Sequence, residues 1–202
     1  MEINELDTPA LMVDYEIVKN NICKEQLLAN TYGKKLRPHI KTHKNVKFAQ
    51  MQIDAGAVGI CTAKVSEAEV MVYGGIKDIL IANEIVGEEK LSKLVYLAHM
   101  AKISTLVDSL DVLIPLSKAA REESVHIGVY VEIDLGDNRC GTSIEDSYEL
   151  ARKIEEDPFL DFLGIETFGG FVFHTKDKET EEENVEKLRS QIQKIIRPVR
   201  MT

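Results

Sequence analysis

The feature that most constrains the fold is an alternation of short β-branched runs with helical patterns, which begins at about residue 36. Strands that alternate with helices form a parallel sheet whose faces the helices cover. About six such strand–helix units fit between residues 36 and 197. The predicted strands are 36–41, 57–62, 78–82, 102–107, 126–134 and 160–166.

The segments between the predicted strands carry helix signals. Residues 88–101 place apolar side chains at the i, i+3, i+4, i+7 spacing of an amphipathic helix. Thr142 with Glu145, and Ser66 with Glu69, have the Ser/Thr-x-x-Glu spacing of a capping box. We therefore expect one helix to begin at each of these pairs.

The predicted units lack the glycine-rich loops that bind nucleotides. No strand is followed by GxGxxG and no GxxxxGK[ST] occurs, which argues against a Rossmann domain and a P-loop. Repeated βα units without these loops favour an α/β barrel of the (β/α)8, or TIM, type. A complete barrel needs about 250 residues, and this chain has 202. We therefore expect a single domain over residues 1–202 that forms an incomplete barrel.

The charge balance argues against several classes of partner. With 25 Lys and Arg against 34 Asp and Glu, the net charge is −9, so the chain lacks the basic surface that nucleic acid requires. No apolar run approaches the ~20 residues of a membrane span, and the acidic N-terminus does not match a signal peptide. Cys23, Cys61 and Cys140 are widely spaced and form no CxxC pair. We expect a cytoplasmic protein that binds neither nucleic acid nor membrane.

The sequence LRPHIKTHK at 36–44 contains the strongest candidate for chemistry. If its first six residues form a strand, Arg37, His39 and Lys41 share one face. Lys41 would then lie at the C-terminal end of the strand, where barrel enzymes place their active sites. A lysine amine at that position can form a Schiff base with a carbonyl compound. The alternative is a solvated lysine in a surface loop.

Four segments resemble one family of enzymes that use pyridoxal 5'-phosphate (PLP). They are TPALMVDYEIVKNNI (8–22), RPHIKTHK (37–44), the segment 56–87 and VEIDLGDNRCGT (131–142). Together they are similar to the metal-dependent D-threonine aldolases and to the eukaryotic-type D-serine dehydratases, both members of the alanine-racemase-like, fold type III group. The resemblance implies the PLP-binding TIM barrel of the alanine racemase N-terminal domain, which precedes a β-domain in these enzymes.

The resemblance also implies a reaction. A PLP-dependent lyase like D-threonine aldolase cleaves D-3-hydroxy amino acids to glycine and an aldehyde, and Lys41 would hold the cofactor as a Schiff base. Two alternatives stay open. One is a lyase that resembles D-serine dehydratase, and the other is a PLP-binding protein or inactive fragment without turnover.

The same resemblance implies roles for further residues. Arg139 would contact the cofactor ring, with a surface salt bridge to a neighbouring aspartate as the alternative. His174 would act with Lys41 in catalysis by taking the proton of the substrate β-hydroxyl. His39 would bind beside the ring or serve the structure alone. Phe168 is the fourth cofactor-contacting residue, and it stands where a tyrosine is expected, so a phenol hydrogen bond is lost.

Some parts of the family pattern are not found in residues 1–202. They are the glycine-rich phosphate loop, the C-terminal β-domain, and the His and Asp or Cys ligands of a divalent metal (Mn, Mg or Zn). His39 and His43 straddle a predicted strand end, so we predict no metal site from them. We therefore expect a truncated or split enzyme. The resemblance implies that it acts on a small D-amino acid and forms a homodimer.

Overall fold

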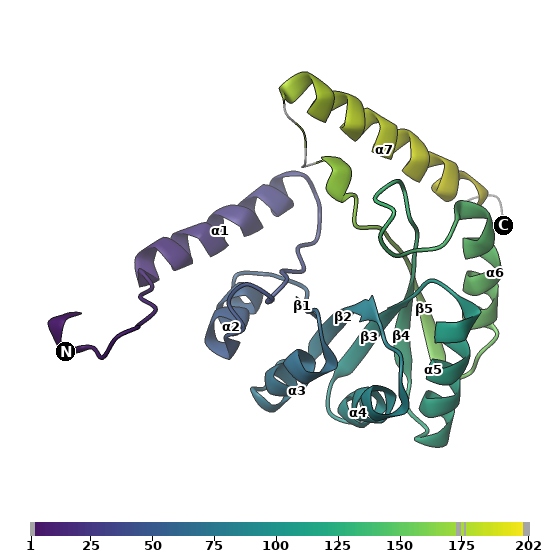
Figure 1. Ribbon diagram of the computed structural model, residues 1–202, viewed down its shortest axis with the longest axis horizontal. Coiled ribbons are helices and arrows are strands. Elements are labelled where there is room, and N and C mark those ends of the chain that lie inside the picture. The colour runs from purple at the N-terminus through teal and green to yellow at the C-terminus, as the bar shows by residue number, and fades with distance from the viewer. Residues whose placement is uncertain (1–2, 173–174, 176, 200–202) are drawn as a thin grey trace.

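A computed structural model describes residues 3–172, 175 and 177–199 of the chain. Its centre is one sheet of five parallel strands that follow the order of the sequence (Figure 1). The strands are β1 (Ile60–Thr62), β2 (Asp78–Glu84), β3 (Lys102–Val107), β4 (Ile127–Glu132) and β5 (Leu160–Glu166). The sheet confirms the predicted α/β class, and within the described residues it does not close into a barrel.

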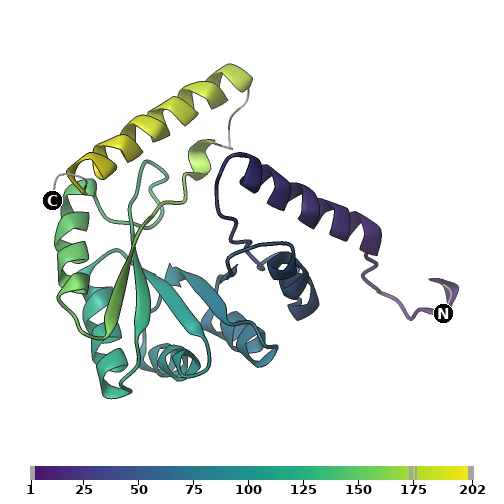
Figure 2. The ribbon, with the colours of Figure 1, turned by 180° about the vertical axis from the view of Figure 1, so that it is seen from behind.

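Helices connect the successive strands, as the alternating sequence pattern predicts. The connecting helices are α3 (Val65–Tyr73), α4 (Glu88–Ala98), α5 (Leu110–Glu122) and α6 (Ile144–Glu155). Outside this series lie α1 (Tyr15–Thr31), α2 (Val46–Asp54) and α7 (Lys178–Val199), with the short 3-10 helices η1 (Ile3–Glu5) and η2 (Gly170–Val172). Seen from behind in Figure 2, α1 and the residues before it extend away from the sheet.

The hydrophobic core lies between the sheet and the helices that connect its strands. Ile79 and Ile81 of β2 are fully buried, and Leu94 of α4 and Leu116 of α5 belong to the same cluster. Burial of one such aliphatic side chain contributes about 1.5–3 kcal/mol. The core therefore fixes the strands, and with them the residues at the strand ends.

The predicted strand 36–41 forms only the edge of the sheet. The Cys61 N–H of β1 donates to the Pro38 carbonyl at 2.7 Å, and the Ile40 N–H donates to the Cys61 carbonyl at 2.9 Å. The extended segment ends at Ile40 because a turn follows, in which the Lys44 N–H donates to the Ile40 carbonyl at 2.8 Å. The prediction of six regular strands is therefore wrong by one, and the predicted catalytic lysine lies in a turn.

One of the two predicted helix starts is shifted by a residue. Ser143, and not Thr142, is the N-cap of α6, and its Oγ accepts a hydrogen bond from the Asp146 N–H at 3.0 Å. Both residues belong to the same Thr-Ser pair, and the shorter Ser side chain is a common N-cap. The helix therefore begins where the sequence pattern predicts it to within one position.

The other predicted capping pair is wrong. Helix α3 begins at Val65, with Lys64 in the N-cap position and without a side-chain cap. Ser66 therefore lies inside the first turn. Glu67 of the first turn reaches back instead, and its carboxylate accepts the N–H of Ala63, which precedes the N-cap, at 2.9 Å.

The N-terminal segment contributes few side chains to the hydrophobic core. Residues 9–14 form neither helix nor strand, and Leu11 within them is 94% exposed. Helix α1 begins after Asp14, whose side chain accepts the Ile17 N–H at 3.0 Å. Among the helices that the structure describes, none combines the length and the apolar character needed to cross a bilayer.

Candidate active site

A pocket of about 140 Å³ opens at the ends of the strands where catalytic residues of barrel proteins lie. Its walls come from all five strands, from the turn after the edge segment, and from the loops that follow β4 and β5. Lys41, His39, Arg139 and Phe168 all line this one pocket. The remaining predicted site residue, His174, lies outside the described residues.

The turn that carries Lys41 is held by its neighbours. Ile40 before it is fully buried, and the Lys41 backbone N–H donates to His39 Nδ1 at 3.2 Å. Because Nδ1 is an acceptor, the neutral ring carries its proton on Nε2. Burial, and then the charge of Lys41, lower the pKa of His39 below 6.5, so the ring is neutral at pH 7. The Lys41 side chain itself is exposed, which leaves its amine open to a ligand in the pocket.

Two other polar residues of the same segment lie elsewhere. Arg37 Nη1 donates to Asp78 Oδ1 at 2.7 Å, at the start of β2 and away from the pocket. Arg37 therefore lies apart from Lys41. It binds the Asp78 carboxylate at the start of β2, whereas the pocket lies at the other end of this strand. His43 packs edge-on against Phe48 of α2, with 5.8 Å between the ring centres. Burial lowers the pKa of His43, and its role in this position is to pack the turn against α2.

Arg139 lies in the loop between β4 and α6. Its guanidinium carbon is 4.6 Å from the centre of the Phe168 ring, which is a cation–π contact. Asp134 accepts three backbone N–H groups of its own turn, and Asp137 accepts the Gly170 N–H at 2.8 Å. These two carboxylates therefore shape the loop, and Arg139 contacts the aromatic ring.

Three glutamates that the sequence reasoning missed also line the pocket. Glu84, Glu132 and Glu166 are the last residues of β2, β4 and β5. Burial, and then the hydrogen bond and the charge of Glu84, raise the pKa of Glu132 to about 8. Burial, and then the charge of Glu84, raise the pKa of Glu166, and Arg139 opposes both shifts. A glutamate at the end of three separate strands is the sequence signal that could have revealed them.

The floor of the pocket is apolar. Leu80 and Leu106 line it and are 7% and 2% exposed. Burial raises the pKa of the Cys61 thiol to about 11, so this side chain stays protonated and packs as a small apolar group. The pocket thus combines an apolar base with an amine, a guanidinium and three carboxyl groups.

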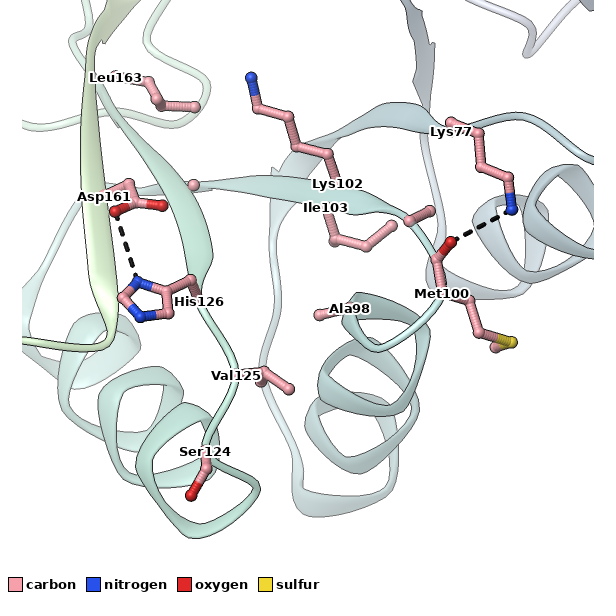
Figure 3. Close-up of a pocket in the computed structure, with 12 residues that line it drawn as sticks. Lys77, Ala98, Met100, Lys102, Ile103, Ser124, Val125, His126, Asp161 and Leu163 are labelled. Carbon is pink, nitrogen blue, oxygen red and sulfur yellow. Dashed lines mark hydrogen bonds and ion pairs between the residues drawn. The ribbon is translucent and has the colours of Figure 1, made fainter.

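A second pocket, of about 680 Å³, lies at the other end of the strands, near the start of β3, β4 and β5 (Figure 3). His126 Nδ1 lies 3.6 Å from Asp161 Oδ1, and Lys77 Nζ donates to the Met100 carbonyl at 3.3 Å (Figure 3). The His126 and Asp161 side chains are 62% and 58% exposed. Because these groups are largely solvated, we assign the candidate active site to the smaller pocket around Lys41.

The fold and the pocket define the class of protein to which the chain belongs. It is a member of the family described as alanine racemase, N-terminal domain, whose model matches residues 13–201. This match confirms the family and the fold that the sequence segments imply.

Three individual proteins show which enzymes of this family the chain is similar to. The chain is 40% identical over 180 residues to a D-threonine aldolase of Arthrobacter sp. This aligned region covers 88% of this chain and 47% of that protein. The crystal structure of D-threonine aldolase from Filomicrobium marinum is similar with a TM-score of 0.88 and 36% identity, over 92% of this chain and 50% of that one. D-threo-3-hydroxyaspartate dehydratase from Delftia sp. HT23 is similar with a TM-score of 0.82 and 28% identity, over 96% and 53%. The chain therefore spans about half the length of these relatives.

Proposed function

We propose that the chain is the cofactor-binding part of a PLP-dependent lyase that cleaves D-3-hydroxy amino acids to glycine and an aldehyde. The observation that carries this proposal is the convergence of Lys41, Arg139 and Phe168 on one pocket at the strand ends. The family match and the similarity to D-threonine aldolases support it.

The residues of the pocket fit the ring end of PLP. The apolar floor of Leu80 and Leu106 suits an aromatic ring, the Lys41 amine suits its aldehyde, and the Arg139 guanidinium suits its phenolic oxygen. When bound, PLP supplies an electron sink for the bond that breaks at the substrate Cα. The described residues include no group of three His, Cys, Asp or Glu side chains that could hold a metal ion, so we assign no step to a metal.

Each side chain has a distinct task in this proposal. Lys41 would hold the cofactor through its amine, and the His39 ring accepts the Lys41 backbone N–H and so fixes the turn. Arg139 would donate to the ring oxygen of the bound cofactor, and its contact with the Phe168 ring would keep the guanidinium in place. His174 takes the proton of the substrate β-hydroxyl, as the resemblance implies.

Titration with PLP and a product assay test the proposal. We expect the 202-residue chain to develop a visible absorbance band with PLP. The formation of glycine and acetaldehyde from D-threonine is then assayed with and without Mn²⁺, because the resemblance implies a divalent metal in the full-length enzymes. Lys41→Arg keeps the positive charge but cannot form the covalent link, so the band should be lost. Lys35→Arg is the matched control, because Lys35 is exposed outside the pocket. A band of equal intensity in both variants would contradict the role of Lys41.

The similarity to a dehydratase favours a second candidate function. A dehydratase would remove water from the same class of substrate and release ammonia and a keto acid. The assay above distinguishes the two reactions, because only the aldolase reaction releases an aldehyde. Absorbance with PLP but no product from D-threonine or D-serine would support a binding protein without turnover.

We also propose a homodimer. The expected result of light scattering on the purified chain is a mass of about twice 22.7 kDa. A mass of one chain would contradict this part of the proposal.

A further inference from the structure

Lys44 closes the turn that carries Lys41. Its backbone N–H donates to the Ile40 carbonyl at 2.8 Å, so the chain turns between these two residues with Lys41 inside the turn. Lys44 has a φ of +46°, in the left-handed region that residues with a side chain rarely adopt. Such a backbone conformation persists where the surrounding structure holds it, and it is found preferentially at functional sites. The contacts that hold Lys44 therefore bear on the position of Lys41.

An ion pair holds the side chain of Lys44. Lys44 Nζ donates to Glu67 Oε1 at 2.6 Å, and Glu67 Oε2 accepts the Ala63 N–H at 2.9 Å. Glu67 lies in the first turn of α3 with its side chain 9% exposed, and Ala63 directly follows β1. Hydrogen bonds between two charged groups are shorter and stronger than those between neutral groups. One buried carboxylate therefore joins the last residue of the Lys41 turn to the end of β1.

The Lys41 turn is thus attached to β1 and its connection on both sides of Lys41. On the side before Lys41, the Ile40 N–H donates to the Cys61 carbonyl at 2.9 Å. On the side after Lys41, the attachment is the ion pair of Lys44 with Glu67. Neither Lys44 nor Glu67 lines the pocket, so the pair can affect a ligand there only through the turn.

We infer that Lys44 and Glu67 form a positioning pair that fixes the Lys41 turn, and with it the place at which the Lys41 amine meets an aldehyde in the pocket. A lysine amine stands on a flexible four-carbon stem, so the place of its backbone decides how often the amine reaches the ligand in a productive orientation. The inference rests on the proposed function insofar as PLP is the aldehyde. The alternative is an ion pair that stabilises the fold and does not affect the Lys41 amine.

A comparison of two ligands separates positioning from stability. The Lys41 amine can add to the aldehyde of PLP with loss of water, whereas it cannot react with pyridoxine 5'-phosphate, which has an alcohol in that position. Lys44→Met keeps a long side chain but removes its charge. We expect the PLP dissociation constant of Lys44→Met to rise about five- to tenfold, the factor for one partly solvated hydrogen bond between charged groups. The dissociation constant of pyridoxine 5'-phosphate should stay the same.

Two variants serve as controls for this comparison. Lys44→Arg keeps a cation for Glu67, so it should recover most of the PLP affinity. Lys118→Met breaks an ion pair with Glu122 on α5, and none of the described residues that line the pocket belongs to this helix. It should bind both ligands as the wild type does. An unchanged PLP affinity in Lys44→Met, or equal losses for the two ligands, would overturn the inference.

Amide hydrogen exchange in the ligand-free chain tests the turn without PLP. Glu67→Gln removes one charge of the ion pair and leaves Lys44 itself in place. We expect the Lys44 amide to exchange about five- to tenfold faster in this variant, because turns at the surface exchange by local opening. The matched reference is the Ser124 amide, since Ser124 has a φ of +54° and its N–H donates to the Arg121 carbonyl at 3.2 Å. Equal acceleration at both amides, or none at Lys44, would contradict a role of the pair in fixing the turn.

The two measurements separate this inference from the proposed function. If the wild-type chain does not bind PLP, the proposed function fails, while exchange at the Lys44 amide still decides whether the pair fixes the turn. If PLP binds to the wild type and Lys44→Met binds it equally well, the positioning role of Lys44 and Glu67 is wrong and the proposed function stands.

Discussion

Replacement of Gly141 by alanine tests how the backbone holds the loop that carries Arg139. Gly141 has a φ of +107°, which residues with a side chain rarely adopt. An added Cβ would lie 2.5 Å from Asp134 N and 2.7 Å from the Ile133 carbonyl carbon. These backbone atoms cannot move aside easily, because the Asp134 N–H donates to the Thr142 carbonyl at 3.0 Å. The substitution therefore combines backbone strain with a steric overlap.

The two contributions can be separated with a second glycine of the same loop. The strained φ costs about 1–2 kcal/mol and the overlap a further 1–3 kcal/mol, roughly. We expect Gly141→Ala to lower the free energy of unfolding in urea by about 3–4 kcal/mol. Gly136→Ala is the matched control, because its φ is +128° and its added Cβ would meet open space, so about 1–2 kcal/mol should be lost. Equal losses in the two variants would refute the argument from backbone contact.

Three further predictions concern charge and the aromatic contact. Because the folded-state pKa of Glu132 is raised from 4.5 to about 8, its stabilisation is complete below pH 4.5 and is lost as the pH rises to 8. The largest loss of stability that this pKa shift allows is about 5 kcal/mol. We take less than half of this limit: the wild type should lose about 2 kcal/mol relative to Glu132→Gln between pH 5 and 8.5 in urea denaturation. Burial raises the pKa of Glu67, but hydrogen bonds from Lys44 and a backbone N–H lower it below 4.5 on balance. Glu67→Gln should therefore cost about 1–2 kcal/mol at pH 7, and the loss should shrink as the pH falls below 4. Phe168→Leu removes the ring under Arg139, so the PLP dissociation constant should rise about threefold with little change in stability.

The class of fold could be predicted because its signals are local. Apolar side chains at helical spacing in 88–101 predict α4, and β-branched runs predict the five regular strands. The edge segment could not be predicted in the same way. Residues 36–41 have the sequence pattern of a strand. The turn after Ile40 and the short pairing with β1 depend on tertiary contacts, which that pattern does not contain.

The candidate site, like the fold, could be predicted from the sequence only in part. Lys41 and Arg139 stand in motifs that a resemblance can identify, and the structure brings both to one pocket. The pairing of Glu132 with Glu166 follows from the register of β4 and β5, which no local pattern contains. Likewise, the binding of Arg37 to Asp78 depends on which strand lies beside β1.

Reduction of the PLP-treated chain with borohydride, followed by peptide mass spectrometry, tests the central claim most directly. The account predicts a pyridoxyl group on Lys41, because this lysine alone among those in the described structure lines the pocket with Arg139 and Phe168. Label absent from Lys41, or spread evenly over exposed lysines, would contradict a cofactor site at the strand ends.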